Sequence, residues 1–221
     1  HVAYQNPYNP VKEYFESLPA APDGAIKKFC NYVHTEGNIF FHTIFRKFLI
    51  AAVARVYEQV EPPMLVLTGG QGIGKSRLAS WLCPDSKYFH SGPIRPDKND
   101  DQILLGKTFL WEVAELSATT KKADRDALKF FLTLPVVEVR KPYGRESLQI
   151  KPITSFIGTV NDFTGFLDDP TGSRRFHISE VFYIDFAYSK EMKVDQVWAE
   201  AYNAYNSGEN WVLTPEEARI R

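Results

Sequence analysis

Cysteine is scarce in this sequence, and its scarcity excludes two kinds of small-protein architecture. The two cysteines, Cys30 and Cys83, stand far apart, and neither belongs to a CxxC pair or has a histidine at metal-ligand spacing. We therefore expect neither a disulfide scaffold nor a structural zinc site, and we expect a reducing compartment.

Long apolar runs and an excess of one charge are also missing. No run approaches the roughly 18 apolar residues that a membrane-spanning helix needs, and no basic-then-apolar leader stands at the start. We therefore expect a cytoplasmic protein with no membrane partner. The sequence opens with His1 instead of Met, which indicates a processed product or, as we expect, an excised domain. Because 26 basic residues nearly balance 27 acidic ones, nucleic acid would have to bind a local basic patch.

The spacing of apolar residues predicts an all-helical region at residues 1–61. Asn9 and Pro10 have the character of an N-cap and a first helical residue. A second helix is expected from about Asp23 to Val33. A third carries an apolar stripe over residues 41–56, and its charged residues, among them Lys47 and Arg55, fall mostly off that stripe.

From Met64 onward, short apolar runs alternate with helical stretches, which is typical of an α/β sheet. The expected strands are 64–68, 108–113, 153–159 and 176–178, and the expected helices are 75–82, 124–134 and 194–205. A Pro-Tyr-Gly turn between residues 136–140 and 147–150 predicts a β-hairpin. The predicted organisation is a helical subdomain at 1–61, an α/β core at 62–189 that includes a basic hairpin at 136–151, and a helical segment at 190–221.

A glycine-rich motif, G-x-x-x-x-G-K-[ST], follows the first predicted strand and opens a predicted helix. In such a loop, backbone N–H groups surround phosphate oxygens, the lysine reaches the β- and γ-phosphates, and the serine hydroxyl binds Mg²⁺. The motif therefore predicts ATP and Mg²⁺ as ligands, against the alternative of a chance glycine turn. The residues expected at the nucleotide are Gly69, Gly70, Gln71, Gly72, Ile73, Gly74, Lys75, Ser76 and Arg77.

Polar residues after two later strands extend this expectation to hydrolysis. Glu112 and Glu115 follow the apolar run 108–111, where one carboxylate can orient Mg²⁺ and another can activate water. We assign Glu112 to the metal, and the residue that activates water stays open between the two. Asn161 ends the next apolar strand and can contact the γ-phosphate or the attacking water. The alternatives are solvated strand-end charges for the glutamates and an ordinary turn for Asn161.

Two adjacent arginines, Arg174 and Arg175, stand in a turn-rich loop before the last predicted strand. Guanidinium groups there can stabilise the charge of phosphoryl transfer, in the same subunit or across an interface. Alternatively, they form surface ion pairs with Asp168 and Asp169.

The predicted hairpin is basic, with four basic residues against one acid between positions 140 and 151. Cations that neutralise phosphates, together with an aromatic ring at the tip, suit single-stranded DNA. The residues expected to contact it are Arg140, Lys141, Tyr143 and Arg145. An ordinary solvated hairpin, or a role for Arg140 or Arg145 at the ATP site or a subunit contact, remains an alternative.

The order of these motifs resembles the virulence-associated E (VapE-like) family of phage and mobile-element proteins, which is related to the superfamily 3 helicases within the AAA+ ATPases. The resemblance is carried by the motifs at residues 6–10 (NPYNP), 70–76 (GQGIGKS), 111–116 (WEVAEL), 141–145 (KPYGR), 156–161 (FIGTVN) and 169–176 (DPTGSRRF). Larger relatives often carry a primase-type domain upstream.

The resemblance implies a P-loop NTPase, AAA+-like parallel-sheet core that assembles as a ring, for which we expect six subunits with ATP between neighbours. It makes Glu112 with Glu115 the Walker B function, Asn161 the sensor, and Arg174 or Arg175 the arginine finger. It also implies a hairpin that projects into the ring channel.

The function expected from the whole sequence is therefore an ATP hydrolase that translocates along or unwinds DNA during replication of a mobile element. An ATP-driven DNA-binding switch or loader, a P-loop kinase and a degenerate assembly scaffold are the alternatives.

Overall fold

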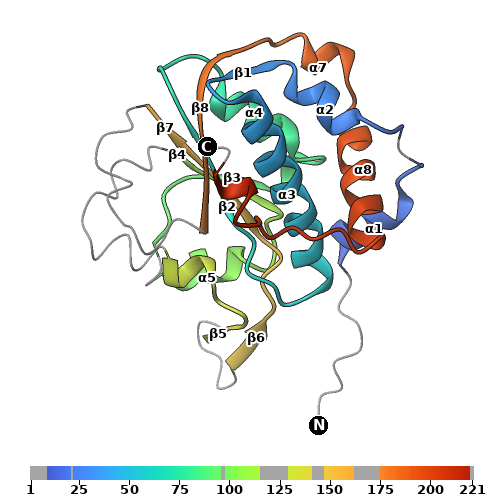
Figure 1. Ribbon diagram of the computed structural model, residues 1–221. Coiled ribbons are helices and arrows are strands. Elements are labelled where there is room, and N and C mark those ends of the chain that lie inside the picture. The colour runs from blue at the N-terminus through green and yellow to red at the C-terminus, as the bar shows by residue number, and fades with distance from the viewer. Residues whose placement is uncertain are drawn as a thin grey trace.

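Helices and strands alternate along most of the chain in the computed structural model, which describes residues 9–20, 22–95, 98–114, 129–140, 147–161 and 175–219 (Figure 1). The helices are α1 (Pro10–Ser17), α2 (Ala25–Cys30), α3 (Asn38–Tyr57), α4 (Lys75–Leu82), α5 (Asn99–Leu104), α7 (Tyr188–Glu191) and α8 (Val194–Asn206), with short 3₁₀ turns at Ser86–Tyr88 and Glu217–Arg219. The strands are β1 (Val33–Thr35), β2 (Met64–Thr68), β3 (Phe89–Ser91), β4 (Leu110–Ala114), β5 (Val137–Arg140), β6 (Ser147–Ile150), β7 (Ser155–Val160) and β8 (Phe176–Ile184).

Six strands form one sheet in the order β1-β8-β2-β7-β4-β3. Only β1 runs antiparallel to its neighbour, and the other pairings are parallel. The expected α/β class is therefore confirmed as a mixed α/β fold with a mostly parallel sheet. Because β2 lies between β7 and β8, the carboxyl ends of these three strands meet at one edge of the sheet, where ligands of open parallel sheets usually bind.

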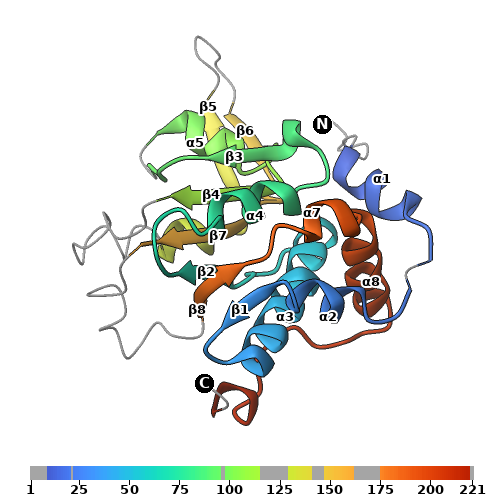
Figure 2. The same cartoon turned by 90° about the horizontal axis from the view of Figure 1, so that it is seen from above.

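Alternating residues of β2 pack on opposite faces of the sheet. Leu65 and Leu67 belong to a core shared with α1, α2, α3, α4 and α8, whereas Met64 and Val66 belong to a second core with Trp111. The period of two is that of a pleated strand covered on both faces. Figure 2 shows α2, α3 and α8 side by side, and their mutual contacts make the larger of the two layers.

Several predicted elements are confirmed. The side chain of Asn9 accepts hydrogen bonds from the backbone N–H groups of Val11 and Lys12 at 3.1 and 3.2 Å, and Pro10 begins α1. Helix α4 has the predicted limits, β2 matches 64–68, and α8 differs from its prediction by one residue. Strands β5 and β6 pair antiparallel as the expected hairpin. Its tip, residues 141–146, lies outside the described residues, as do residues 124–128 of another expected helix.

The prediction of an all-helical segment at 1–61 is wrong between α2 and α3. Val33 lies in β1, where it pairs with Ile184, because a two-residue turn after Cys30 redirects the chain to the edge of the sheet. The cap of α2 is also not Asp23 but Gly24, whose φ of 84° is a left-handed conformation. The last strand, β8, extends to Ile184 because it pairs with β1 beyond the region that it shares with β2.

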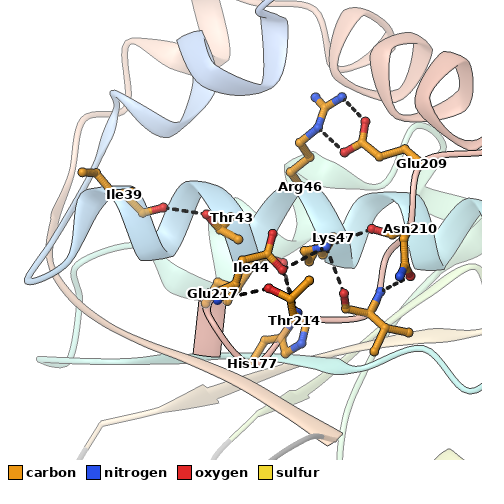
Figure 3. Close-up of polar contacts among 11 residues, drawn as sticks. Ile39, Thr43, Ile44, Arg46, Lys47, His177, Glu209, Asn210, Thr214 and Glu217 are labelled. Atoms are coloured by element: carbon orange, nitrogen blue, oxygen red, sulfur yellow. Dashed lines mark hydrogen bonds and ion pairs between the residues drawn. The ribbon is translucent and has the colours of Figure 1, made fainter. Parts of the chain in front are cut away.

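The expectation that the charged residues of α3 lie off its buried face is wrong for two of them. Lys47 is 7% exposed and donates hydrogen bonds to the carbonyl oxygens of Asn210 and Val212 at 2.9 and 3.0 Å. It also forms an ion pair with the carboxylate of Glu217 at 3.3 Å (Figure 3). Arg55 is 4% exposed and donates to the carbonyl oxygens of Val60 and Leu134. Distant segments cover this helix and supply partners for its cations, as buried charges require.

Cys30 and Cys83 are free and buried. Within the described ranges, no helix has the length and apolar character needed to cross a bilayer.

Candidate functional site

The glycine loop, residues 69–74, leaves the carboxyl end of β2 and passes closely between the neighbouring strands. The N–H of Gly69 donates to the carbonyl oxygen of Val160 at the end of β7, at 3.2 Å. On the other side, a Cβ at position 69 would lie 2.1 Å from the carbonyl oxygen of Val181 in β8, and the φ of 139° is unfavourable for other residues. Glycine is therefore required where the chain enters the loop.

The loop ends at the amino terminus of α4, with Gly74 as the N-cap at φ 96°. A Cβ there would lie 2.3 Å from the ring of Phe186. The first N–H groups of an α-helix have no partner within the helix, and their combined dipole favours an anion. The end of the loop thus has the local structure expected of a phosphate site.

Lys75 is the buried cation of this loop. Its ammonium group donates to the carbonyl oxygens of Gly69 and Gly70 at 2.6 and 2.8 Å and to the side-chain oxygen of Asn161 at 3.2 Å. Burial lowers the pKa of Lys75 below the ordinary value of a lysine. The structure therefore brings Lys75 and Asn161 together. The remaining expected nucleotide residues lie around it: Ile73 is half-buried, and Gly70, Gln71, Gly72, Ser76 and Arg77 are exposed.

Glu112 is held on both of its oxygens by hydroxyl groups from the neighbouring strands. Ser91 of β3 donates to Oε2 at 2.9 Å, and Thr159 of β7 donates to Oε1 at 3.1 Å. The carboxylate is only 2% exposed. Two hydrogen bonds from opposite sides fix its orientation, and a buried carboxylate needs such donors.

Sequence reasoning missed Ser91 and Thr159. No local pattern could have identified them, because their relation to Glu112 depends on the order β3-β4-β7 in the sheet.

Glu112, Asn161 and Lys75 come from three neighbouring strands or the segments that follow them. Lys75 and Asn161 follow the carboxyl ends of β2 and β7, and Glu112 is the central residue of β4, the next strand after β7 in the sheet. Lys75 and Asn161 therefore meet at the carboxyl edge of the sheet, and Glu112 lies within the neighbouring strand β4.

The other predicted site residues are only partly described. Glu115, Arg174, Lys141, Tyr143 and Arg145 lie outside the described residues, and so does the side chain of Arg140 at the end of β5. Arg175 directly precedes β8, and its Nε is buried and finds no hydrogen-bond partner within the described part of the chain.

Phe186 also lies against the glycine loop, and the sequence did not indicate this contact. The guanidinium carbon of Arg77 lies 4.6 Å from the centroid of the Phe186 ring, which is within the range of a cation–π interaction. The contact joins the first turn of α4 to the segment after β8.

A complete protein metal cage does not occur in the ranges that the structure describes, since no three His, Cys, Asp or Glu side chains lie close enough to share an ion. Mg²⁺ commonly uses one or two carboxylates and takes its other ligands from water and substrate phosphates. Ser76, an exposed residue with a hydroxyl, and Glu112, whose carboxylate has a fixed orientation, carry the types of ligand that such a site uses.

Comparisons with known proteins identify a family and a fold. A family model described as the virulence-associated protein E-like domain matches residues 23–221. The apo structure of the NrS-1 C terminal region (305-718) is similar with a TM-score of 0.62 and 18% identity, over 93% of this chain and 52% of that chain. The A form apo structure of the same region has a TM-score of 0.59 and 18% identity, over 94% and 53%.

At this identity the structural likeness shows the fold alone, and the chain spans about half the length of these structures. A search of curated proteins finds no match.

Proposed function

The chain belongs to the virulence-associated protein E-like family, and on that premise we propose that it is a Mg²⁺-dependent ATPase with a P-loop NTPase, AAA+-like core. Its hydrolysis of ATP drives movement along DNA, or unwinding of DNA, in replication of a phage or mobile element. The observation that carries this proposal is the junction of the glycine loop, Lys75 and Asn161 at the carboxyl edge of the sheet.

The triphosphate lies in the glycine loop and against the first turn of α4. Backbone N–H groups of the loop and the helix terminus donate to phosphate oxygens, and the helix dipole adds favourable potential. Lys75 exchanges its contacts with the carbonyl oxygens of Gly69 and Gly70 for the β- and γ-phosphates. Asn161, already within hydrogen-bond distance of Lys75, contacts the γ-phosphate or the attacking water.

Mg²⁺ bound with the nucleotide neutralises charge on the β- and γ-phosphates. Ser76 and Glu112 would hold it, with the carboxylate of Glu112 kept in position by Ser91 and Thr159. Glu112 or Glu115 accepts the proton of the attacking water. The proposal leaves open which of these two carboxylates accepts the proton. It also includes Arg174 or Arg175 as an arginine finger in a hexameric ring.

DNA contact is assigned to the basic hairpin formed by β5 and β6. Lys141, Tyr143 and Arg145 at its tip, with Arg140 in β5, bind the backbone and stack on a base of single-stranded DNA. Helix α5 packs against β5, so the hairpin rests on the same body that carries the ATP site.

The test is ATP turnover per chain, measured against protein concentration with and without single-stranded DNA. A ring motor predicts that turnover rises with concentration and rises further with DNA. Changing Lys141, Tyr143 and Arg145 together to Ala removes the stimulation by DNA and leaves basal turnover intact. A control changes Lys27 and Lys28, two exposed cations of α2, to Ala and keeps the stimulation. Turnover independent of DNA at every concentration contradicts the proposal.

A strand-separation assay on the assembled protein separates the motor from its alternatives. A loader binds ATP and DNA but separates no strands, and a kinase phosphorylates a small acceptor and ignores DNA. A scaffold keeps all its properties when Lys75 is changed to Ala.

A further inference from the structure

Arg77 and Phe186 form a cation–π pair beside the glycine loop, and the chemistry of phosphate transfer does not use this pair. Arg77 is exposed on the first turn of α4, and its guanidinium carbon lies 4.6 Å above the ring of Phe186. Phe186 is half-buried and packs against the main core, so one partner of the pair is fixed while the other faces solvent.

The order of the strands gives the direction in which a bound triphosphate runs. Lys75 contacts Asn161, which follows β7, and Glu112 lies one strand further away, in β4. The γ-phosphate and metal therefore lie on the β7 side of β2. The opposite neighbour of β2 is β8, and Phe186 follows β8 by two residues. A nucleotide with its γ-phosphate near Asn161 places its nucleoside on the side of Phe186.

Phe186 is also close enough to the loop to meet that nucleoside. A Cβ on Gly74, the last residue of the loop, would lie 2.3 Å from the Phe186 ring. Arg77 stands two residues after Lys75 on the same helix, past the end of the loop that surrounds the α- and β-phosphates. The pair is thus the aromatic and cationic surface next to the α-phosphate end.

We propose that the base of the nucleoside triphosphate stacks on the guanidinium plane of Arg77, which Phe186 supports from below. The inference rests on the proposed function, because it presupposes a triphosphate in the glycine loop. Guanidinium groups stack on aromatic rings and on bases, and the interaction depends on the π-face and not on the hydrogen-bonding edge of the base. The pair therefore recognises an aromatic nucleoside and discriminates weakly between ATP and GTP.

The test compares Mg-ATP with Mg-tripolyphosphate, which has the phosphates but no nucleoside, in calorimetric titrations of the full chain. Phe186→Leu keeps apolar volume and removes the ring. We expect it to weaken ATP binding about tenfold and to leave tripolyphosphate binding within about twofold, whereas Phe186→Tyr binds both ligands as the unmodified chain does. The matched control is Phe182→Leu, an aromatic residue of β8 that is 58% exposed, and it changes neither affinity.

Equal changes in the two affinities, or no change, overturn the inference. If the unmodified chain binds neither ligand, the proposed function itself fails, and the two failures are thereby distinguished. A second measurement needs no variant: 8-azido-ATP is photo-crosslinked to the unmodified chain and the labelled peptide is identified. Label at residue 77 or at residues 185–188 supports the inference, and label confined to any other segment contradicts it.

Discussion

The ammonium group of Lys75 lies 3.2 Å from the side-chain oxygen of Asn161, although 86 positions separate the two residues in the sequence. The contact arises because β2 and β7 are parallel neighbours, so that the segments after them meet at the same edge. Two motifs that the sequence could only place in order along the chain are therefore joined in one site.

Ser91 donates a hydrogen bond to Glu112, and we expect its hydroxyl to affect turnover more than nucleotide binding. Ser91→Ala removes the donor to Oε2 and frees one side of the carboxylate. Loss of a residue that orients a metal-site carboxylate costs about tenfold or more in activity. We expect kcat to fall by that factor with little change in the KM for ATP, in steady-state assays.

Ser91→Thr is the matched control, because it keeps the hydroxyl, and it should retain most of the turnover. Wild-type kcat in Ser91→Ala, or a change in KM alone, would show that the hydrogen bond does not serve hydrolysis.

Lys47 fastens the carboxyl-terminal segment to α3. Lys47→Met leaves the carbonyl oxygens of Asn210 and Val212 without their donor and removes the ion pair with Glu217 (Figure 3). We expect unfolding in urea to require about 2–4 kcal/mol less free energy, with faster proteolysis after Ser207. Lys28→Met, at an exposed lysine of α2, should change stability by less than about 0.5 kcal/mol. Equal stability of the two variants would refute this role.

We expect His177 to make the fold sensitive to mild acid. Burial lowers the pKa of His177 to about 4, an effect that the carbonyl oxygen of Ile44 partly offsets and that Lys47 reinforces. The unfolded chain has a histidine pKa near about 6.5. Because the unfolded state takes up the proton first, stability is full above that value and is lost as pH falls from about 6.5 toward 4.

We therefore expect His177 to lower the free energy of unfolding by about 2 kcal/mol between pH 7 and pH 5. Urea unfolding of His177→Gln at both values should show a correspondingly smaller loss, whereas His34→Gln, at an exposed residue of β1, should follow the unmodified chain. Parallel profiles for His177→Gln and the unmodified chain would exclude His177 as the source.

Local signals in the sequence predicted the elements around the glycine loop well. The apolar run of β2, the motif and the helical period of α4 are contiguous, so their limits needed no knowledge of distant partners. The cap at Asn9 is equally local. By contrast, β1 has three residues and exists because it pairs with β8, some 150 positions away. Tertiary pairing of that kind leaves almost no trace in a short segment.

The burial of the cations of α3 could not be predicted either, because it depends on packing against distant segments. Lys47 is covered by residues 210–217, and no periodicity within residues 38–57 indicates that cover. In the candidate site, Lys75, Glu112 and Asn161 were identified from motifs. Their neighbours Ser91, Thr159 and Phe186 depend on the order of strands, which the sequence did not specify. The division into three parts, at 1–61, 62–189 and 190–221, stays a prediction.

Calorimetric titration of Mg-ATP into the unmodified chain and into Lys75→Met shows whether the glycine loop holds a triphosphate. Methionine keeps most of the length of the lysine side chain and removes its charge and its three donors. If the glycine loop holds a triphosphate, the unmodified chain binds Mg-ATP and Lys75→Met binds it about 30-fold more weakly or worse, because a charge-assisted contact is lost. Equal affinities in the two proteins, or no heat from the unmodified chain in several buffers, would show that Lys75 and this loop do not bind a triphosphate.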